Sequence, residues 1–293
     1  MKFERTRIMN FEGAIIGMRN PKNSWDKSDS FFGLLNLNDI EQDYEVTKAW
    51  IQKNHPDMDL YGYEYDNKEL DEEFDSINQW LIKNGILQTD PQKYPEIAEV
   101  AYIGPNDMRL AQQLIKAGPE HRKFMRQIFV SVDITAPLFW YKEFDTYKVG
   151  TTANSTSTMH KITSAPITLD CFEIDDFVNV EYPAEAQRPE AKSNCDHDFV
   201  QMCLIPYLEY LRQKYLETKD KVYWKELIRW LPESWLQKRT ITMNYENIRS
   251  MVHQRMNHKL NEWSGKDNDS LSNFIAWART LPYAEELIFY GNE

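Results

Sequence analysis

The loop from Lys148 to Thr158 carries the side chains best suited to binding a ligand. Six of the eight residues from Thr151 to Thr158 carry a hydroxyl group, and another is Asn154. Short hydroxyl and amide donors gathered in one loop suit a phosphate or the edge of a cofactor. Gly150 is the only glycine in this loop, so it does not predict the glycine-rich cradle of a dinucleotide-binding fold.

A strand and a helix must position this loop. Residues 127–134 alternate apolar and polar side chains, with Ile128, Val130, Val132 and Ile134 on one face, which is the pattern of a half-buried strand. A helix is then expected over residues 137–144, with Thr135 at the N-cap and Pro137 in the first turn.

A second stretch with chemical potential is expected to be helical from Asn244 to Arg255. Its apolar stripe is Ile248, Met251 and Val252, at spacings of three and four. Asn244 and Arg255 fall on the same stripe by spacing. A cation on a buried stripe requires an anionic ligand or a buried carboxylate as its partner, and the sequence leaves both open.

Together the two stretches resemble the flavin-dependent thymidylate synthases over about residues 107–260. In that family a strand leads into Ala-Pro-hydrophobic-Phe, followed by a basic Arg-His-Arg triplet and then Ser-x-Asn-x-x-Ser-x-Arg. A Leu-Pro and an Asn-x-Arg on a long helix that ends in Arg come later. The matching residues here are Ala136-Pro-Leu-Phe139, Thr152-Ala-Asn154-Ser-Thr-Ser157, Leu231-Pro232, Asn244 and Arg255, with His121 at the place of a flavin-binding histidine.

Several basic positions of the family pattern hold other residues here. The triplet falls on Thr146, Tyr147 and Lys148, so one cation is kept. The family arginines before Leu-Pro, in Asn-x-Arg and at the end of the loop motif fall near Ile228, with Arg229 beside it, and on Glu246 and Met159. In the family these positions hold flavin and nucleotide phosphates.

The resemblance implies an α+β fold in which an antiparallel or mixed sheet is flanked by long helices. It implies FAD-dependent methylation of dUMP to dTMP, with methylenetetrahydrofolate and NADPH as co-substrates, by a homotetramer. The implied catalytic residues are Arg255 and Ser157. The implied flavin contacts are His121, Lys148, Asn154 and Asn244. The implied substrate contacts are Thr152, Ser157, Arg229 and Arg255.

Two other functions remain open because of the lost arginines. One is an enzyme of the same fold that acts on a different pyrimidine nucleotide or uses flavin differently. The other is a non-catalytic nucleotide-binding protein that kept the core and lost the cofactor. The sequence therefore leaves open whether the chain is an enzyme.

Composition limits the possible partners. The formal charge of −12 argues against duplex nucleic acid, whose phosphates require clustered Lys and Arg. Three cysteines form no disulfide framework, and no leader or membrane-spanning run is apparent, so a cytoplasmic protein is expected. Cys195, His197 and Cys203 are metal-ligand types, but their spacing matches no structural zinc pattern, and no metal is expected.

The chain is expected to divide into an extension, residues 1–100, and a core, residues 101–293, with an irregular insertion at 162–195. A first strand is expected at residues 11–18 and a helix at 70–81. Asn106 and Asp107 should cap a helix that ends at Gly118. Further helices are expected over residues 199–216, 221–230 and 271–280.

Overall fold

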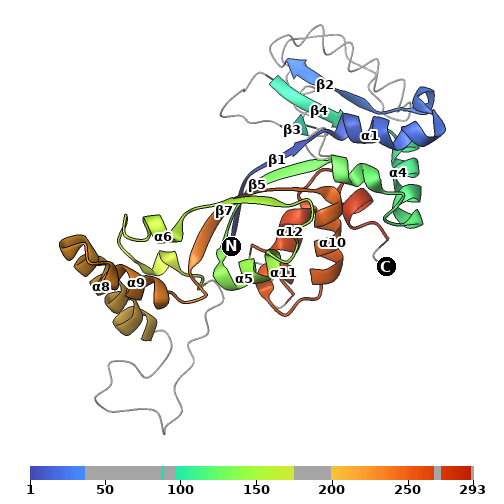
Figure 1. The fold of residues 1–293 in the computed structure, drawn as a ribbon. Helices are drawn as coiled ribbons and strands as arrows, with labels where there is room; N and C mark the ends of the chain where they lie inside the picture. The colour runs from blue at the N-terminus through green and yellow to red at the C-terminus, as the bar shows by residue number, and fades with distance from the viewer. Residues whose placement is uncertain (37–86, 89–96, 175–198, 267–271, 292–293) are drawn as a thin grey trace, which may run out of the picture. The chain divides into compact units, whose positions relative to one another are not determined.

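The structure is a computed structural model that describes residues 1–36, 87–88, 97–174, 199–266 and 272–291 (Figure 1). The helix expected at residues 70–81 lies outside the described residues, as do Cys195, His197 and most of the insertion at 162–195.

The larger sheet is built from the strand that the sequence identified. β5, Phe129–Pro137, lies between β1, Lys2–Met9, and β7, Leu236–Asn244, and β7 pairs with β6, Thr152–Ser155. β6 and β7 are antiparallel. The four alternating residues Ile128, Val130, Val132 and Ile134 are fully buried, which confirms the predicted face. The expected α+β class with an antiparallel sheet is also confirmed.

A smaller sheet has the order β2-β4-β3. β2 is Phe31–Asn36, β4 is Ile97–Tyr102 and β3 is Leu87–Gln88, and both pairings with β4 are antiparallel.

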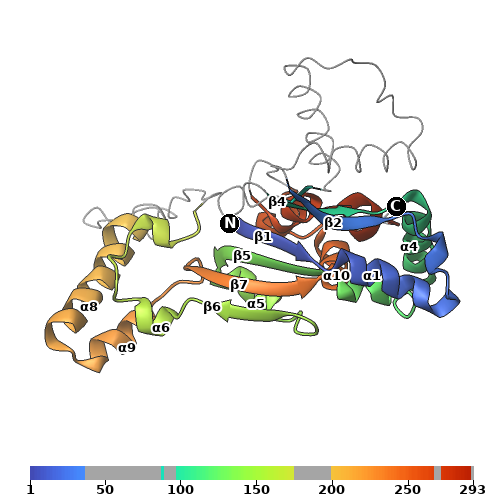
Figure 2. The same cartoon turned by 90° about the horizontal axis from the view of Figure 1, so that it is seen from above.

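Most of the remaining described residues are helical (Figures 1 and 2). The α-helices are α1 Phe11–Arg19, α4 Pro105–Ala117, α5 Leu138–Phe144, α6 Thr158–Lys161, α8 Ile205–Thr218, α9 Lys221–Arg229, α10 Tyr245–Arg255, α11 Asn261–Ser264 and α12 Phe274–Arg279. Short 3-10 turns lie at Asn20–Lys22, Trp25–Lys27, Lys123–Gln127 and Leu169–Cys171, and π-helical turns at Phe199–Leu204 and Ala284–Ile288.

The chain forms two compact units, each assembled from distant segments. Unit 1 contains residues 1–6, 131–242 and 258–273, and unit 2 contains residues 7–130, 243–257 and 274–293. Unit 1 has an aromatic cluster in which Trp140 lies 4.6 Å from Trp263 and 5.0 Å from Phe144 between ring centroids. In unit 2, Phe11 packs edge-on against Tyr245 and Tyr283.

Unit 1 also contains a hairpin of α8 and α9, which lie side by side in Figures 1 and 2. Its buried residues include Leu208, Leu211 and Leu227. Glu209 accepts hydrogen bonds from Arg212 at 2.7 and 2.8 Å and from the Ile167 backbone N–H at 3.0 Å. The hydrogen bond from Ile167 therefore ties the hairpin to the preceding segment.

The first strand is wrongly predicted, because residues 11–18 form helix α1. Its buried residues Phe11, Ala14, Ile15 and Met18 recur at spacings of three, one and three, which is helical. The strand β1 precedes it and ends at Met9, and the left-handed backbone of Asn10 turns the chain into the helix.

Helix α4 is confirmed, but its predicted cap is wrong. The N-cap is Gly104, and the backbone N–H groups of Asn106 and Asp107 donate to Asp29 at 2.8 and 3.1 Å. The Asp107 side chain is fully buried and pairs instead with Arg19 at 2.5 Å. The local sequence could not reveal these partners, because Asp29 and Arg19 are distant from α4 along the chain.

Other predicted boundaries also shift. β5 extends through Thr135 to Pro137, which becomes the extended N-cap of α5, so Thr135 does not cap that helix. Helix α9 matches its prediction closely, and α8 begins after a π-helical turn. The last predicted helix is shorter and spans Phe274–Arg279.

Candidate functional site

A pocket of about 390 Å³ opens in unit 1, where α5 ends and the chain turns toward β6. Cavities of roughly 300–1,000 Å³ are typical of small-ligand sites. Its lining residues are Phe144, Asp145, Tyr147, Lys148, Thr151 and Ala153. The pocket thus combines two aromatic residues, one carboxylate, one ammonium and the hydroxyl groups of Tyr147 and Thr151.

Local sequence explains this turn. Asp145 closes α5, and its backbone N–H donates to the Tyr141 carbonyl at 2.8 Å. Gly150 adopts φ 76°, a left-handed conformation that glycine adopts without steric cost. The chain can therefore reverse between Lys148 and β6, which pairs with β7 from Thr152 onward.

Arg239 of β7 binds the pocket residue Asp145 and packs on Tyr141. Its guanidinium lies 3.7 Å from the centroid of the Tyr141 ring, donates to Asp145 Oδ1 at 2.7 Å and donates to Gln237 Oε1 at 2.9 Å. The Arg239 side chain is 15% exposed. Tyr141 is itself fixed, because its hydroxyl donates to the Ile134 carbonyl at 2.7 Å and burial raises its pKa.

Two pocket residues have polar groups suited to a ligand. The Lys148 side chain is exposed. The Oγ1 atom of Thr151 is buried and forms no hydrogen bond with any part of the chain that the structure describes. A buried hydroxyl without a partner costs about 1–3 kcal/mol, so a bound ligand that reaches it gains affinity.

The rest of the hydroxyl-rich loop does not line this pocket. Thr152 and Asn154 are exposed residues of β6, which corrects the expectation that the whole segment is a loop. Ser157 is also exposed, and its Oγ accepts the His160 backbone N–H at 3.2 Å as the N-cap of α6. Arg229 is an exposed residue at the end of α9, where it pairs with Glu226.

Helix α10 begins at Asn244 as predicted, but the side chain of Asn244 has a structural role. Asn244 and Asn247 form a reciprocal capping box, in which each side-chain oxygen accepts the other's backbone N–H at 2.9 and 3.2 Å. Ile248, Met251 and Val252 are fully buried, whereas Arg255 is only half-buried. The arginine that lies on the buried face is Arg249, not Arg255.

Arg249 is a functional candidate that the sequence reasoning missed. It is 6% exposed, and its Nη1 donates to the carbonyls of Leu287, Ile288 and Tyr290 at 3.3, 2.8 and 2.7 Å. Within the described ranges its guanidinium forms no hydrogen bond to a carboxylate. A signal was present, because Asn247-Ile-Arg249 keeps the Asn-x-Arg spacing three residues after Asn244.

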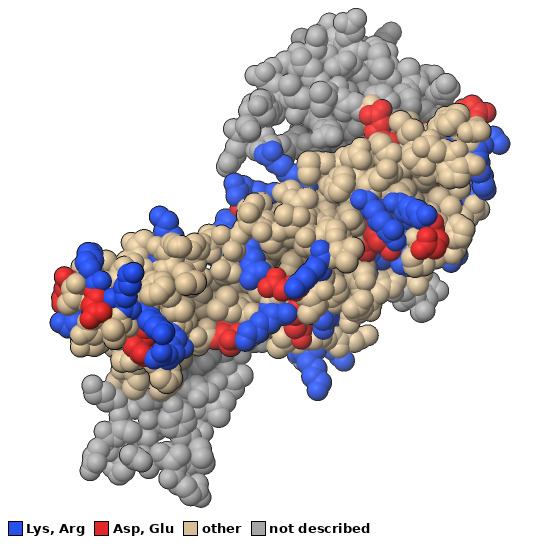
Figure 3. Space-filling view, in the orientation of Figure 1, with Lys and Arg blue, Asp and Glu red and all other residues tan. Residues whose placement is uncertain are grey.

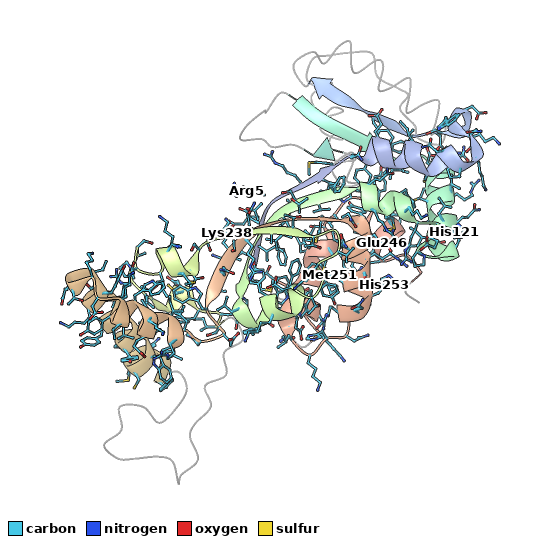
Figure 4. All side chains as sticks on the ribbon, viewed as in Figure 1. Arg5, His121, Lys238, Glu246, Met251 and His253 are labelled. Carbon is cyan, nitrogen blue, oxygen red and sulfur yellow. The ribbon has the colours of Figure 1, made fainter. Side chains whose placement is uncertain are left out.

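Positive charge gathers around Arg249 in unit 2. Arg122 donates to both carboxylate oxygens of Glu246 at 2.9 and 3.0 Å. Burial, assisted by Arg122, lowers the pKa of Arg249 to about 10, and burial with Arg249 lowers the pKa of His253. His121, next to Arg122 in the chain, is exposed; Figure 4 labels His121, Glu246 and His253.

A second charged network in unit 1 was not anticipated. Asp133 of β5 is 2% exposed and accepts from Thr240 Oγ1 at 2.7 Å and Arg5 Nε at 2.8 Å, with Lys238 Nζ at 3.3 Å. Burial alone raises the pKa of Asp133, but the hydrogen bonds from Thr240, Arg5 and Lys238 outweigh it, so the pKa is lowered. Figure 4 shows Arg5 and Lys238 close to one another.

Charge, metal and membrane features add little to this description. Lys and Arg are interspersed with Asp and Glu on the visible face in Figure 3. The described residues contain no cluster of three or more His, Cys, Asp or Glu side chains arranged to hold a metal. Among the same residues, no helix has the length and apolar character to cross a membrane.

Comparisons with known proteins give similarities to solved structures. No protein-family model and no curated protein matches the chain. The structure is similar to a flavin-dependent thymidylate synthase from Helicobacter pylori complexed with FAD and dUMP, at 15% identity and TM-score 0.41. It is also similar to a UMP/dUMP methylase from Streptomyces cacaoi bound with 5-bromo-UMP, at 14% identity and TM-score 0.42. Each match covers 64% of this chain and 84% of the other.

Proposed function

We propose that the chain binds a uracil nucleotide in the pocket between α5 and β6. The observation that supports this proposal most directly is the lining of the pocket. Two aromatic residues, Lys148 and the Thr151 hydroxyl line a volume of about 390 Å³. The half-buried ring of Tyr147 suits a flat base, and the ammonium group suits a phosphate. A mononucleotide has a base and a phosphate, and this pocket offers a group suited to each.

The activity that we propose for this nucleotide is flavin-dependent methylation, dUMP to dTMP. This rests on the ordered resemblance of Ala136-Pro-Leu-Phe139, the Thr152–Ser157 segment and Leu231-Pro232 to the flavin-dependent thymidylate synthases. The Asn-x-Arg pattern at Asn247 and Arg249 supports it. FAD, when bound, supplies the redox chemistry and the relay of the one-carbon unit.

The chain's own residues fit part of a flavin site. The buried guanidinium of Arg249 interacts with the positive charge of Arg122. An anionic phosphate beside Arg249 would offset the cost of burying its charge. His121 of unit 2 is exposed, as are Lys148 and Asn154 of unit 1, and the resemblance alone supports their proposed roles as flavin contacts. Asn244 is committed to the cap of α10, so its proposed role is to hold the helix that carries Arg249.

The remaining residue roles are proposals of the same kind. From the resemblance alone, we propose that Arg255 of unit 2 contacts the uracil edge or the phosphate of a nucleotide. Thr152 and Ser157 are proposed as phosphate donors and Arg229 as an outer cation. The proposed task of these four residues is to bind and orient the nucleotide. Methylenetetrahydrofolate and NADPH as co-substrates, a homotetramer and a cytoplasmic location stay predictions.

A specific observation favours a second candidate, a nucleotide-binding protein without flavin chemistry. Glu246 stands where the first Asn-x-Arg register places a family arginine, and it neutralises Arg122. Arg229 is likewise paired with Glu226. The triplet position keeps one cation, Lys148. With fewer unpaired cations, the chain can still bind the single phosphate of a mononucleotide but binds the two phosphates of a dinucleotide less well.

Absorption spectroscopy distinguishes the two candidates. The purified chain is incubated with FAD, passed through a gel-filtration column and scanned in the visible range, with and without dUMP. A retained flavin band that shifts with dUMP supports flavin-dependent methylation and leads to a turnover assay. dUMP binding without retained flavin supports the second candidate, and binding of neither ligand refutes both.

Calorimetric titration with dUMP tests the pocket itself. Lys148→Ala should weaken dUMP binding by roughly 10-fold, because a charge-assisted hydrogen bond contributes about 1.5–3 kcal/mol. Lys142→Ala is the matched control, since Lys142 is a nearby exposed lysine that pairs with Glu233 and does not line the pocket. Equal effects of the two substitutions would contradict the proposed site.

Arg255→Ala tests the role carried over from the family. Arg255 is half-buried at the last residue of α10, so its removal should leave the helix folded. We expect dUMP binding to be lost while the circular dichroism spectrum is unchanged. An unchanged dUMP affinity would refute the role of Arg255 that the resemblance implies.

A further inference from the structure

We infer that Asp145 selects the base in this pocket by accepting the N3–H of uracil. The inference rests on the proposed nucleotide binding and names the residue that determines its specificity. Asp145 is the only carboxylate among the lining residues of the pocket. An ionised carboxylate only accepts hydrogen bonds, so it distinguishes ring nitrogens that carry a hydrogen from those that do not.

Uracil and cytosine differ at the atom that such a carboxylate reads. Ring nitrogen N3 of uracil carries a hydrogen and donates, whereas N3 of cytosine has a lone pair and accepts. The carboxylate attracts the first and repels the second. Discrimination of this kind is strong when the reading group is held in place, because the wrong base leaves that group without its hydrogen bond.

The structure holds Asp145 in place through one of its two oxygens. Arg239 Nη1 donates to Oδ1 at 2.7 Å, and the backbone N–H of Asp145 donates to the Tyr141 carbonyl at 2.8 Å. Oδ2 forms no hydrogen bond within the part of the chain that is described. The carboxylate is therefore anchored on one side, with its other oxygen free to accept from a base.

Arg239 acts as the positioning residue. Its guanidinium is held between the face of Tyr141 and the amide oxygen of Gln237, at 3.7 Å from the ring centroid and 2.9 Å from the oxygen. Its hydrogen bond to Oδ1 fixes the orientation of the Asp145 carboxylate. Lys148, the pocket's cation, takes the phosphate, which uracil and cytosine nucleotides share.

The test compares dUMP and dCMP as probes, by isothermal titration calorimetry on the full chain. We expect the unsubstituted protein to bind dUMP roughly 10- to 100-fold more tightly than dCMP, the range set by one charge-assisted hydrogen bond. Asp145→Asn should bring the two affinities within about threefold of each other, because an amide presents either an acceptor or a donor. Asp145 is 51% exposed, so this substitution should leave the fold intact.

Two further variants separate positioning from general damage. Arg239→Gln should narrow the dUMP-to-dCMP ratio, and Arg239→Lys should restore part of it, because lysine keeps the charge without the planar stack. Lys148→Ala should weaken both nucleotides equally and leave the ratio unchanged.

The outcomes distinguish the inference from the function on which it rests. Equal binding of dUMP and dCMP, unaffected by Asp145→Asn, overturns the role of Asp145 while nucleotide binding stands. Binding of neither nucleotide to the unsubstituted protein overturns the proposed function and this inference with it.

Discussion

The backbone of Arg5 gives the sharpest test of the charged network on β1, β5 and β7. Arg5 has φ 52°, a left-handed conformation within strand β1, and its side chain donates to Asp133. A left-handed backbone costs an L-residue about 1–2 kcal/mol, a cost that glycine avoids. We therefore expect Arg5→Gly to be more stable than Arg5→Ala by about 1 kcal/mol, the reverse of the usual order in a strand.

The lost hydrogen bonds set the size of the Arg5→Ala effect. Charge-assisted bonds contribute about 1.5–3 kcal/mol when buried, but the Arg5 side chain is 71% exposed, and solvent screening reduces this to about 1 kcal/mol. Asp133 keeps Thr240 and Lys238 as partners in the variant. Arg5→Ala should thus cost about 1 kcal/mol, and Arg5→Gly close to nothing.

Urea unfolding followed by circular dichroism at pH 7 measures both variants. Arg7 on the same strand has an ordinary φ and supplies the matched control, because Arg7→Gly should be less stable than Arg7→Ala by about 0.5–1 kcal/mol. The same order of glycine and alanine at both positions would refute the left-handed conformation of Arg5.

The contribution of Asp133 also has a defined pH dependence. Its pKa is lower in the folded protein than the usual 3.8, so its stabilisation is present above that pH and is lost as pH falls through the lowered pKa. The stability difference between the unsubstituted protein and Arg5→Ala should therefore shrink on acidification from pH 7 toward pH 3. A difference that grows on acidification would contradict this sign.

Three other predictions concern two side chains with shifted pKa values and one buried hydrogen bond. Glu209→Gln should lower the free energy of unfolding by about 2–3 kcal/mol at pH 7, because the hydrogen bond from Arg212 lowers the pKa of Glu209 to about 2. Urea unfolding at a series of pH values should show this loss shrinking as the pH falls from about 4.5 to 2. The lowered pKa of His253 means that the unfolded chain takes up the proton first, so stability should fall below about pH 6.5, and His253→Gln should flatten that slope in thermal unfolding. Tyr141→Phe should cost about 1–2 kcal/mol in urea unfolding, because the Ile134 carbonyl is left buried without its donor, and no measurable loss would contradict the role of that bond.

The proposed flavin chemistry depends on which basic residues this chain has near the positions of the family pattern that its sequence resembles. The pattern's triplet keeps Lys148, while Arg249 adds a buried guanidinium on α10. Arg249 is bonded to backbone carbonyls of the last described turn, so its charge is solvated by dipoles without being neutralised. An anion that displaced or joined those carbonyls would bind more strongly than at an exposed arginine.

Regular periodicity made several elements predictable. Strand β5 follows from its alternating apolar residues, and α10 from the capping signal at Asn244 with Ile248, Met251 and Val252. Helix α1 could also have been predicted, because Phe11, Ala14, Ile15 and Met18 have helical spacing. The strand prediction is wrong because it relies on the apolar composition of this segment, whereas the spacing of its apolar residues is helical.

The sequence alone determined the strand that leads into α5, the start of α10 and the residue types around the pocket, because local periodicity and capping chemistry act between near neighbours. Only the tertiary structure decided which of those residues meet. β7 brings Arg239 against Asp145 and Tyr141, Arg19 pairs with Asp107, and Asp29 caps a helix 77 residues away. Such pairings depend on packing of distant segments, where a buried charge takes whichever partner the fold brings within hydrogen-bonding distance.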